Sequence, residues 1–572
     1  MVAPVGAGGG TPPPPPPPND TVAPTINLTS PLAGTTVSNT VSVSANATDD
    51  VGVASVQFLL DNAPLGSPVT SAPYSVAWDT STAVPGSHVL QGRATDFAGN
   101  STTSASVAVT VSASGGSGGS TSGVWGAPIT TPIVMVHANL LPTGEVLTWD
   151  GDVNGHNALV WNTATGAFTS VPNTLTNMFC SGHCLLSDGR VIVTGGHLSS
   201  HVGLRDTNTF DPVTRAWTRV APMVEARWYP TATALPDGRV LVTSGENGCN
   251  GCVVDTPEIY DPQLDSWTAL TRATLSLPFY PHMFVLPDGR VLAAATSGNP
   301  IVSRVLDIPT QTWSVVDPTA VDGGSSVMYA PGKIMKAGRS ADPEQPEIPS
   351  TTATFVLDMT QPTPRWRPTP PMAFPRAYHT LTLLPDGTVL ATGGGPTTDA
   401  VGVNSAVLAA EVWSPVTETW TTLASMSRPR LYHSTALLLP DATVVVMGGG
   451  RLASTDQPTD QFSAQVFSPP YLFKGARPVI TSAPATAAYG ASISVQTPDA
   501  ASIGSVSLVR LGSATHAFNT NQRILQLPFT AGAGTLSVQT PANANLAPPG
   551  YYMLFILNAN GVPSVASMVQ LR

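Results

Sequence analysis

A turn sequence that recurs along the middle of the chain constrains its fold more than any other feature. Pro-Asp-Gly-Arg occurs at 236–239 and again at 287–290, each time between two short apolar runs. An Asp-Gly pair in that setting predicts a β-hairpin. Related turns occur at 142–145, 187–190, 331–333, 385–388 and 440–443. Seven such hairpins, at a period of roughly 45–50 residues with four short strands per repeat, predict a seven-bladed β-propeller over 124–475.

Two further marks accompany the turns. A glycine pair follows the second strand in several repeats, as at 195–196 and 448–449, and an aromatic residue lies seven positions after an apolar or aromatic one, as from Tyr260 to Trp267. The repeat resembles the kelch repeat. We therefore assign the glycine pairs and tryptophans to blade packing and not to chemistry.

The composition agrees with an all-β fold and excludes several function classes. Charged residues are 10% of the chain, whereas Gly (51) and Pro (56) are abundant, which favours strands and turns over helices. The net charge is −11 and no basic stripe occurs, so no nucleic-acid partner is expected. No run of 18 apolar residues is present, so no membrane span is expected.

The low lysine content bears on the location of the protein. Lys333, Lys336 and Lys474 are the only lysines, and this, with the linker composition described next, suits an exported protein. We expect a monomer that is secreted by a bacterium or held at its surface, although no signal sequence is visible in the chain.

Other segments flank the predicted propeller. Residues 1–21 form a Pro/Gly-rich linker and 113–123 a Gly/Ser linker. Residues 22–112 alternate apolar and polar positions between regularly spaced turns, which predicts an Ig-like β-sandwich. Residues 476–572 predict a second sandwich. The 22–112 segment resembles bacterial Ig-like modules of surface and secreted enzymes, and we interpret it as a spacer, with carbohydrate or cell-wall binding as the alternative.

One position of the repeat holds residues that suit a metal site. Cys180, Tyr229 and His433 each lie eight residues before the Asp of their hairpin turn, and Tyr280 and Tyr378 occupy the same position in two other repeats. The first strand of each propeller blade lines the central channel, so we expect these side chains near the axis at one mouth of the channel. Cys, Tyr and His in one repeated position make a poor core and a good set of metal ligands.

Three other cysteines and one histidine are interpreted as structural. Cys249 and Cys252 form a lone CxxC, for which a local disulfide or a surface turn is favoured over zinc because no second ligand pair is near. His183 and Cys184 follow Cys180 on a strand that is expected to run inward, so we interpret both as packing residues.

Four motif stretches, in order, resemble those of the galactose oxidase and glyoxal oxidase family of copper radical oxidases. They are Asn-Met-Phe-Cys-Ser-Gly at 177–182, Arg-Trp-Tyr-Pro at 227–230, Leu-Tyr-His-Ser at 431–434 and Gly-Ser-Ala-Thr-His-Ala-Phe-Asn-Thr-Asn-Gln-Arg at 512–523. The resemblance covers about 124–572. It implies that a propeller and a C-terminal sandwich of the E-set type together build one copper site.

The resemblance also implies a role for each motif residue. Cys180 would form a thioether to the ring of Tyr229, and this pair would bind copper and hold a radical. His433 and His516 would be the imidazole ligands of one Cu(II), and His516 would reach the channel from the C-terminal sandwich. Tyr432 would be a further ligand and the base that takes the proton of the substrate hydroxyl.

The chemistry requires such a pair of redox groups. Oxidising an alcohol to an aldehyde removes two electrons, and one Cu(II) accepts only one, so a second acceptor must lie on the metal. The expected substrates are a primary alcohol or a small aldehyde as its hydrate, with O₂ as the acceptor and hydrogen peroxide as the product. The alternative is a non-catalytic kelch-type propeller that binds carbohydrate in a surface or matrix protein.

Departures from the galactose oxidase pattern bear on the substrate. Where that enzyme has a tryptophan over the thioether, this chain has Asn247, and a sugar-contacting glutamine is replaced by Gly395. Small aldehydes or simple primary alcohols are therefore favoured over galactose. The remaining candidate pocket residues are Trp228, as a different aromatic neighbour, with Arg339, Tyr378, His379 and His282.

Overall fold

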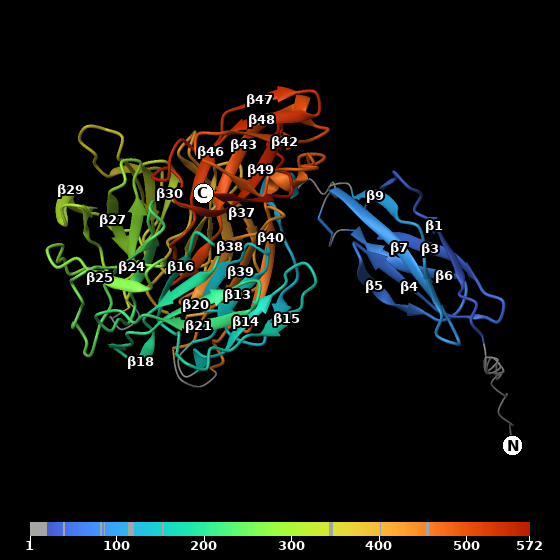
Figure 1. Cartoon of the computed structure of the whole chain (residues 1–572), viewed down its shortest axis with the longest axis horizontal. Helices are drawn as coiled ribbons and strands as arrows, with labels where there is room; N and C mark the ends of the chain where they lie inside the picture. The colour runs from blue at the N-terminus through green and yellow to red at the C-terminus, as the bar shows by residue number, and fades with distance from the viewer. Residues whose placement is uncertain are drawn as a thin grey trace, which may run out of the picture. The chain divides into compact units, whose positions relative to one another are not determined.

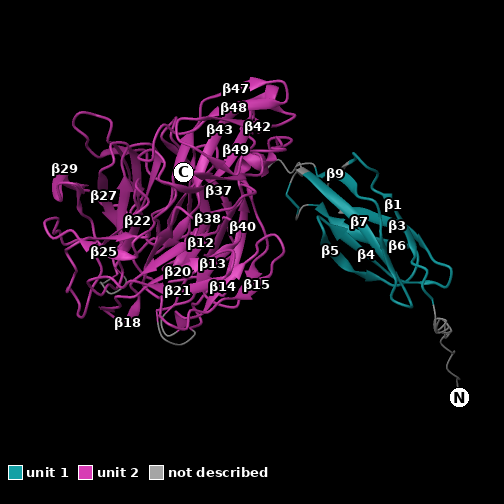
Figure 2. Ribbon diagram, viewed as in Figure 1, with its two compact units in different colours: residues 1–116 teal, residues 117–572 magenta. Residues whose placement is uncertain are grey.

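The chain forms two compact units, 1–116 and 117–572, which are described separately (Figure 2). The structure is a computed structural model and describes residues 20–37, 40–80, 83–84, 86–111, 119–151, 154–342, 347–400, 402–452 and 457–572. Most of the predicted 1–21 linker and the first part of the 113–123 linker lie outside these residues. From Gly119 the second linker forms the short helix α1 (Gly119–Ser122).

Unit 1 is a β-sandwich of two sheets around one apolar core. Val43, Val56, Phe58, Trp78 and Leu90 are buried between the sheets, and their alternation with polar residues produces the period-2 pattern of the sequence. One sheet has the order β1 (Thr25–Ser30), β3 (Thr40–Thr48) and β6 (Tyr74–Asp79). The other contains β2 (Thr36–Val37), β9 (Val107–Val111), β7 (Gly86–Asp96), β4 (Val53–Leu60) and β5 (Ala63–Val69), with β8 (Ser101–Thr103) paired to β7.

Within the described residues, unit 2 contains seven antiparallel blades, numbered here in chain order. Blades 1 to 3 comprise β12 (His137–Leu140), β13 (Val146–Trp149), β14 (Ala158–Trp161) and β15 (Phe168–Ser170); β16 (Gly182–Leu185), β17 (Val191–Thr194), β20 (Thr207–Asp211) and β21 (Ala216–Val220); and β22 (Thr231–Ala234), β23 (Val240–Thr243), β24 (Glu258–Asp261) and β25 (Ser266–Ala269). A small hairpin, β18 (His197–Ser199) and β19 (Val202–Gly203), lies between β17 and β20.

The remaining blades follow the same plan. They comprise β26 (Pro281–Val285), β27 (Val291–Thr296), β28 (Val302–Asp307) and β29 (Thr312–Ala320); β30 (Ser325–Ala330), β31 (Lys333–Ala337), β32 (Thr354–Asp358) and β33 (Arg367–Thr369); β34 (Thr380–Leu383), β35 (Val389–Thr392), β36 (Ala409–Ser414) and β37 (Thr419–Ser425); and β38 (Ser434–Leu438), β39 (Val444–Gly448) and β40 (Ser463–Ser468). Blade 7 is completed by β10 (Val124–Trp125) and β11 (Ile129–Thr130), which both pair with β40. Because the first strands of unit 2 complete the last blade, the ring is closed and that sheet edge is covered.

The recurring turns are held by the side chain of their own aspartate. Asp188 accepts the backbone N–H of Arg190 at 3.1 Å and its guanidinium Nε at 2.8 Å, and Asp237 and Asp288 make the same two contacts. The glycine that follows has a positive φ, for example 92° at Gly189, which only glycine adopts without strain. The motif therefore specifies each hairpin locally.

Tryptophans of the outer strands connect neighbouring blades. The indole N–H of Trp217 donates to the carbonyl of Val171 at 2.7 Å, and that of Trp267 donates to the carbonyl of Ala221 at 2.8 Å. Trp313 makes the equivalent bond to Ala273. The repeated aromatic position is thus a packing position, as predicted.

A second β-sandwich follows the propeller within unit 2. Its sheets have the orders β41 (Thr486–Ala487), β50 (Ser567–Leu571), β49 (Gly550–Asn558), β43 (Ile503–Arg510) and β46 (Ile524–Gln526), and β42 (Ser492–Gln496), β48 (Thr535–Gln539) and β47 (Phe529–Gly532). Two 3₁₀ turns, η3 (Pro470–Phe473) and η4 (Ala500–Ser502), precede β41 and β43. In Figure 1 these C-terminal strands, in red, lie together at one end of unit 2.

A hairpin of this sandwich, β44 (Ser513–Thr515) and β45 (Phe518–Asn519), joins the propeller. β44 pairs with the innermost strand of blade 1, with Ala138 opposite Ala514 and Asn139 opposite Ser513. The ring of Phe518 stacks on His282 of blade 4, with ring centroids 4.1 Å apart. The hairpin therefore lies in the central channel, between blades that are far apart in sequence.

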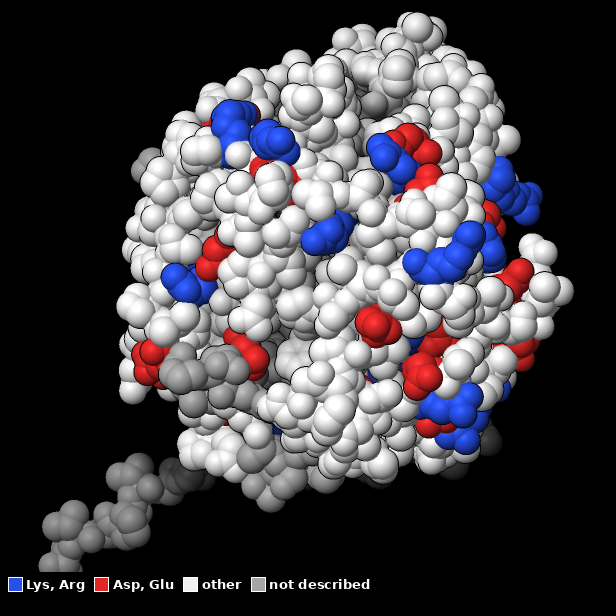
Figure 3. All heavy atoms as spheres, turned by 90° about the vertical axis from the view of Figure 1, so that its left-hand side faces the viewer, with Lys and Arg blue, Asp and Glu red and all other residues white. Residues whose placement is uncertain are grey.

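The expected fold class, a seven-bladed propeller flanked by an Ig-like and a C-terminal sandwich, is confirmed. No helix among the described residues is long and apolar enough to cross a membrane. On the face of the molecule in Figure 3, lysines and arginines are interspersed with aspartates and glutamates. That face carries no basic patch of the kind that nucleic-acid binding requires.

We predict that replacing Glu258 with alanine destabilises unit 2 strongly. Glu258 forms an ion pair with Arg227 at 2.8 Å, and the two side chains are 1% and 0% exposed. Removing one partner leaves a buried charge without compensation, which costs about 3–5 kcal/mol. Urea unfolding followed by tryptophan fluorescence measures this, because every tryptophan except Trp78 lies in unit 2.

The exposed pair of Arg367 and Glu418 provides the matched control. These side chains are 57% and 30% exposed, so Glu418→Ala should change the free energy of unfolding by only about 0–1 kcal/mol. Equal losses in the two variants would contradict the role assigned to burial.

We predict that the metal-free protein loses stability as the pH falls from about 6.5 towards about 3. Burial lowers the pKa of His183, His282 and His379 to about 3. In this window the unfolded chain binds protons that the folded chain does not, so the free energy of unfolding decreases with decreasing pH. Each such histidine contributes a slope of about 1.4 kcal/mol per pH unit.

His282→Gln tests the assignment, because it removes one of these groups. Its unfolding free energy, measured at several pH values by urea denaturation, should depend less steeply on pH by that amount. An unchanged slope would show that His282 is not held neutral by the fold.

Candidate metal centre

The repeated position singled out in the sequence has one backbone conformation in every blade that carries it. Cys180, Tyr229, Tyr280, Tyr378 and His433 have φ values between 44° and 65°. Residues other than glycine rarely adopt this left-handed conformation, and bulky ones do so only where the surroundings enforce it. Each residue lies just before the innermost strand of its blade. The structure therefore brings the same position of several repeats to the same mouth of the channel.

Hydrogen bonds connect these positions from blade to blade. The backbone N–H of Tyr229 donates to the carbonyl of Cys180 at 2.8 Å, and that of Tyr280 donates to the carbonyl of Tyr229 at 3.1 Å. Cys180 and Tyr229 also pack in one buried apolar cluster. The two residues expected to form the thioether are thus neighbours, although 49 residues separate them in the sequence.

Buried arginines hold the chain just before these positions. Arg227 donates to the carbonyls of Ser244 and Thr256, both at 2.7 Å, and Arg376 makes corresponding bonds in blade 6. Arg430 precedes His433 and donates to two carbonyls of blade 7. Sequence reasoning missed these anchors. Their signal is an arginine two residues before the repeated position in blades 3 and 6.

His516 lies at the turn of the β44–β45 hairpin and is held there by serines of two blades. His516 and Ala517 both have positive φ values, 47° and 66°. The hydroxyl of Ser297 donates to the carbonyl of His516, and that of Ser325 donates to the carbonyl of Ala517, both at 2.6 Å. The turn is therefore fixed to the inner walls of blades 4 and 5.

Two phenols and two imidazoles converge on one buried point. The hydroxyls of Tyr229 and Tyr432 contact each other directly. The ring centroids of His433 and His516 are 4.5 Å apart, and that of Tyr229 is 4.7 Å from that of His516. All four side chains are at least nine-tenths buried. These are the four residues that the resemblance assigned as metal ligands.

The hydrogen bonds of His433 and His516 use Nδ1 of each ring and leave Nε2 as an acceptor without a donor. Nδ1 of His433 donates to the carbonyl of Gly450 at 2.6 Å. Nδ1 of His516 contacts the hydroxyl of Thr515 at 2.6 Å, and that hydroxyl donates to the carbonyl of Val136. Nε2 of both rings is buried and has no hydrogen-bond partner. A buried nitrogen lone pair without a partner is what a metal ligand requires.

The protonation states also fit a cation. Burial lowers the pKa of His433 to about 3 and that of His516 well below its ordinary value, so both imidazoles are neutral, as metal binding requires. Burial likewise raises the pKa of Tyr229 and Tyr432 well above the ordinary value. A bound divalent cation reverses this effect for the phenols it contacts. Two imidazoles and two phenols form a donor set that suits Cu(II).

Trp228 covers the ring of Tyr229. The two ring centroids are 3.9 Å apart and the planes are 9° from parallel. Phe279 contacts both rings edge-on, at 5.3 Å and 5.2 Å. Asn247, which the resemblance assigned to the position of the covering tryptophan of galactose oxidase, is exposed and bridges to Val202. The aromatic cover thus comes from the residue that directly precedes Tyr229.

Two adjoining cavities lead to the centre. The larger has a volume of about 290 Å³ and is lined by Trp228, Tyr229, Tyr432 and His433, together with Phe179, His197, Ser200, Phe279, Asp342, Arg451 and Leu452. The smaller, of about 20 Å³, adds Arg339, Tyr378 and His516. Of the candidate pocket residues, Trp228, Arg339 and Tyr378 line these cavities, whereas Asn247, His282 and His379 do not.

Three further buried histidines, His183, His282 and His379, lie outside the centre formed by the two tyrosines and two histidines. His183 contacts Nδ1 of His137 and the hydroxyl of Ser513, and His282 contacts the hydroxyls of Ser326 and Ser297. His379 is fully buried beside Gly338.

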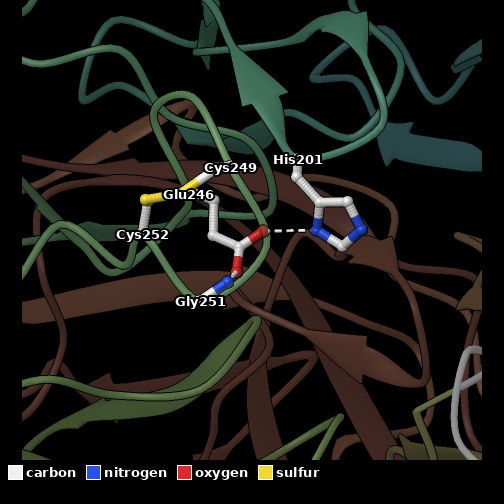
Figure 4. The surroundings of a disulfide bond; sticks show 5 residues. All are labelled: His201, Glu246, Cys249, Gly251 and Cys252. Atoms are coloured by element: carbon white, nitrogen blue, oxygen red, sulfur yellow. Dashed lines mark hydrogen bonds and ion pairs between the residues drawn. A yellow bond between two sulfur atoms is a disulfide. The ribbon is translucent and has the colours of Figure 1, made fainter.

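Cys184 lies in an apolar cluster between blades 2 and 3. Cys249 and Cys252 form a disulfide (Figure 4).

Comparisons with known proteins agree with this architecture. The family model described as "Glyoxal oxidase N-terminus" matches residues 156–471, "Galactose oxidase-like, Early set domain" matches 477–571, and "Bacterial Ig domain" matches 24–91. A galactose oxidase of Gibberella zeae is 32% identical over 495 residues, which cover 78% of this chain and 70% of that protein. An aldehyde oxidase of Vitis pseudoreticulata is 28% identical, over 69% of this chain and 82% of that protein.

A solved structure shows the same fold. It is described as a novel fungal alcohol oxidase with catalytic diversity among the AA5 family, in complex with copper. It superposes with a TM-score of 0.70 and 27% identity over 78% of this chain and 99% of that one. The fold, the motif residues at the channel mouth and these matches lead to one assignment. The chain belongs to the galactose oxidase and glyoxal oxidase family of copper radical oxidases.

Proposed function

We propose that this protein oxidises a primary alcohol, or a small aldehyde as its hydrate, with O₂ to the aldehyde or acid and hydrogen peroxide. Tyr229, Tyr432, His433 and His516 would hold one Cu(II), and Cys180 joined to Tyr229 by a thioether would carry a radical. One observation supports this most: two phenol hydroxyls and two unpartnered imidazole nitrogens meet in a buried site.

Copper bound there would accept one of the two substrate electrons. The residues of the chain account for the rest of the reaction. Tyr432 takes the hydroxyl proton. The oxidised ring of Tyr229 takes the hydrogen atom from the substrate carbon, which supplies the second electron and the second proton. O₂ then receives two electrons and two protons and leaves as hydrogen peroxide, so the reaction balances without nicotinamide or flavin.

The surroundings of Tyr229 suit a ring that is oxidised. A sulfur substituent from Cys180 makes a phenol easier to oxidise than tyrosine itself. Trp228, Phe279 and Tyr280 enclose the ring, with centroids 3.9 to 5.2 Å away. With this aromatic enclosure Tyr229 is only 6% exposed, and exclusion of water protects a reactive intermediate from side reactions.

The larger cavity favours a small substrate. Aromatic side chains form much of its wall, and apart from the proposed ligands the polar side chains that line it are His197, Ser200, Asp342 and Arg451. Arg451 is bound on both sides by buried carboxylates, those of Asp150 and Asp460, so its charge is already compensated. With Asn247 and Gly395 where galactose oxidase has its tryptophan and glutamine, we propose small aldehydes or simple primary alcohols in preference to galactose.

The proposal extends to the location and the front unit. We propose export or surface display, with unit 1 as a spacer that could instead bind carbohydrate or the cell wall. A pull-down with cell-wall material or polysaccharide, done with the full chain and with the chain lacking unit 1, separates these two roles. If unit 1 is a spacer, both proteins stay in solution; if it binds the wall, only the full chain is pulled down.

We predict that incubating the purified protein with copper and air removes two hydrogen atoms from the chain. The loss reflects the new bond between Cys180 and Tyr229, which intact mass spectrometry and a peptide map detect as one cross-linked peptide pair. Cys180→Ser should keep the fold but show neither the mass change nor more than a trace of oxidase activity.

Cys184→Ser is the matched control, because Cys184 is equally buried and lies four residues further along. It should still form the cross-link. Wild-type protein that binds copper without forming the linked peptide would overturn the enzyme proposal and favour the non-catalytic binder. A peroxide-coupled assay with galactose, glyoxal, glycolaldehyde, glycerol and benzyl alcohol then identifies the substrate class, and galactose as the best substrate would contradict the preference stated above.

A further inference from the structure

Trp228 lies flat on Tyr229 because groups from two loops hold it there. Its indole N–H donates to Nδ1 of His197 at 3.0 Å. The ring of His201 contacts the indole with centroids 4.9 Å apart. The backbone N–H and carbonyl of Trp228 both bond to Glu246 at 2.8 Å. His197 and His201 belong to the loop of blade 2 that contains β18 and β19, and Glu246 belongs to the loop after β23 in blade 3.

Glu246 connects the two loops through its carboxylate. One oxygen contacts Nδ1 of His201 at 2.6 Å, and the other accepts the backbone N–H of Gly251 at 2.6 Å (Figure 4). Glu246 is 1% exposed. A buried carboxylate is costly unless both oxygens are satisfied, so its position depends on these two partners. His201 in turn has a positive φ of 62° at the turn between β18 and β19.

The disulfide closes the loop that presents Gly251 to Glu246. Residues 247–251 are exposed, so packing does not determine their conformation. Cys249 and Cys252 are bonded, and Cys252 donates its N–H to the carbonyl of Cys249 at 3.0 Å. Asn247 donates to the carbonyl of Cys252 at 3.3 Å. A cross-link over a short exposed loop restricts its conformations. This disfavours conformations in which the Gly251 N–H no longer reaches the carboxylate of Glu246.

We propose that Glu246, His201 and the disulfide loop 247–252 form a brace whose role is to hold Trp228 on the ring of Tyr229. These are positioning residues: Glu246 and His201 contact Trp228, and the loop 247–252 contacts Glu246. The consequence for the radical rests on the proposed function: an indole held flat on the oxidised ring spreads its electron deficiency and excludes water. The brace itself is a property of the folded chain and can be tested without copper.

The test compares four variants of the full-length protein. Glu246→Ala removes the carboxylate, Glu246→Gln keeps its shape without the charge, and Cys249→Ser with Cys252→Ser opens the loop. Asp61→Ala is the matched control, because Asp61 makes the same kind of contact, 2.6 Å to Nδ1 of His88, in unit 1. Hydroxyl-radical labelling of the metal-free proteins, with mass spectrometry of the peptide containing Trp228, reports the accessibility of the indole.

We expect labelling of Trp228, which is 5% exposed, to rise about threefold or more in Glu246→Ala and in the double serine variant, because local opening exposes groups that lose their anchors. Glu246→Gln should restore part of the protection, and Asp61→Ala should match the wild type. Labelling equal to the wild type in both brace variants, or a similar rise in Asp61→Ala, would overturn the brace. If Glu246→Ala does not fold, the double serine variant decides alone, since it alters only the loop.

Copper-loaded samples give the second readout. The absorption band and the lifetime of the Tyr229 radical should both decrease in the brace variants, while copper content is unchanged. A wild-type protein that forms no radical contradicts the proposed function, whereas the labelling result still decides the brace. Normal radical lifetime in variants whose Trp228 is exposed would show that the brace has no effect on the cofactor.

Discussion

The pairing of β44 with β12 is the interaction on which the candidate centre depends. It carries a turn of the C-terminal sandwich into the propeller channel, where Ser297 and Ser325 bind its carbonyls. Without this pairing, His516 would not lie beside His433 and Tyr229. A ring of blades can supply residues only from its inner edge. Because His516, a proposed ligand, comes from the C-terminal sandwich, both domains contribute to the candidate centre. The stability of the sandwich and the geometry of the site are therefore coupled.

A strained backbone position provides Tyr229 and His433, two of the proposed ligands. In five blades a residue other than glycine adopts a left-handed conformation just before the inner strand, and buried arginines fix the preceding loop in three of them. The strain is offset by hydrogen bonds to neighbouring blades, which is why it persists. The same left-handed turn at the channel mouth is thus used repeatedly, with Cys, Tyr or His at the position.

Much of the fold and the identities of the central residues could be predicted from the sequence. The Asp-Gly turns are local signals, because Asp188 and its equivalents bond to residues two positions away, and so the number of blades follows from counting them. The repeated position could be aligned through the same turns. The anchors Arg227 and Arg376, by contrast, bind carbonyls that are 17 to 33 residues away, and no local pattern indicates those partners.

The sequence by itself determined an all-β chain of seven repeats and placed Cys, Tyr and His at one repeated position, because hairpin periodicity and turn chemistry are encoded within a few residues. The sequence offered Trp228 as an aromatic neighbour, but only the tertiary structure decided that its ring covers that of Tyr229. The resemblance assigned Asn247 to the covering position. In the fold Trp228 stacks on Tyr229 instead, and His201 and Glu246 contact Trp228 from loops of two blades. Such a contact depends on how neighbouring blades pack. Stacking between side chains of different loops produces no periodic pattern in the sequence from which it could be predicted.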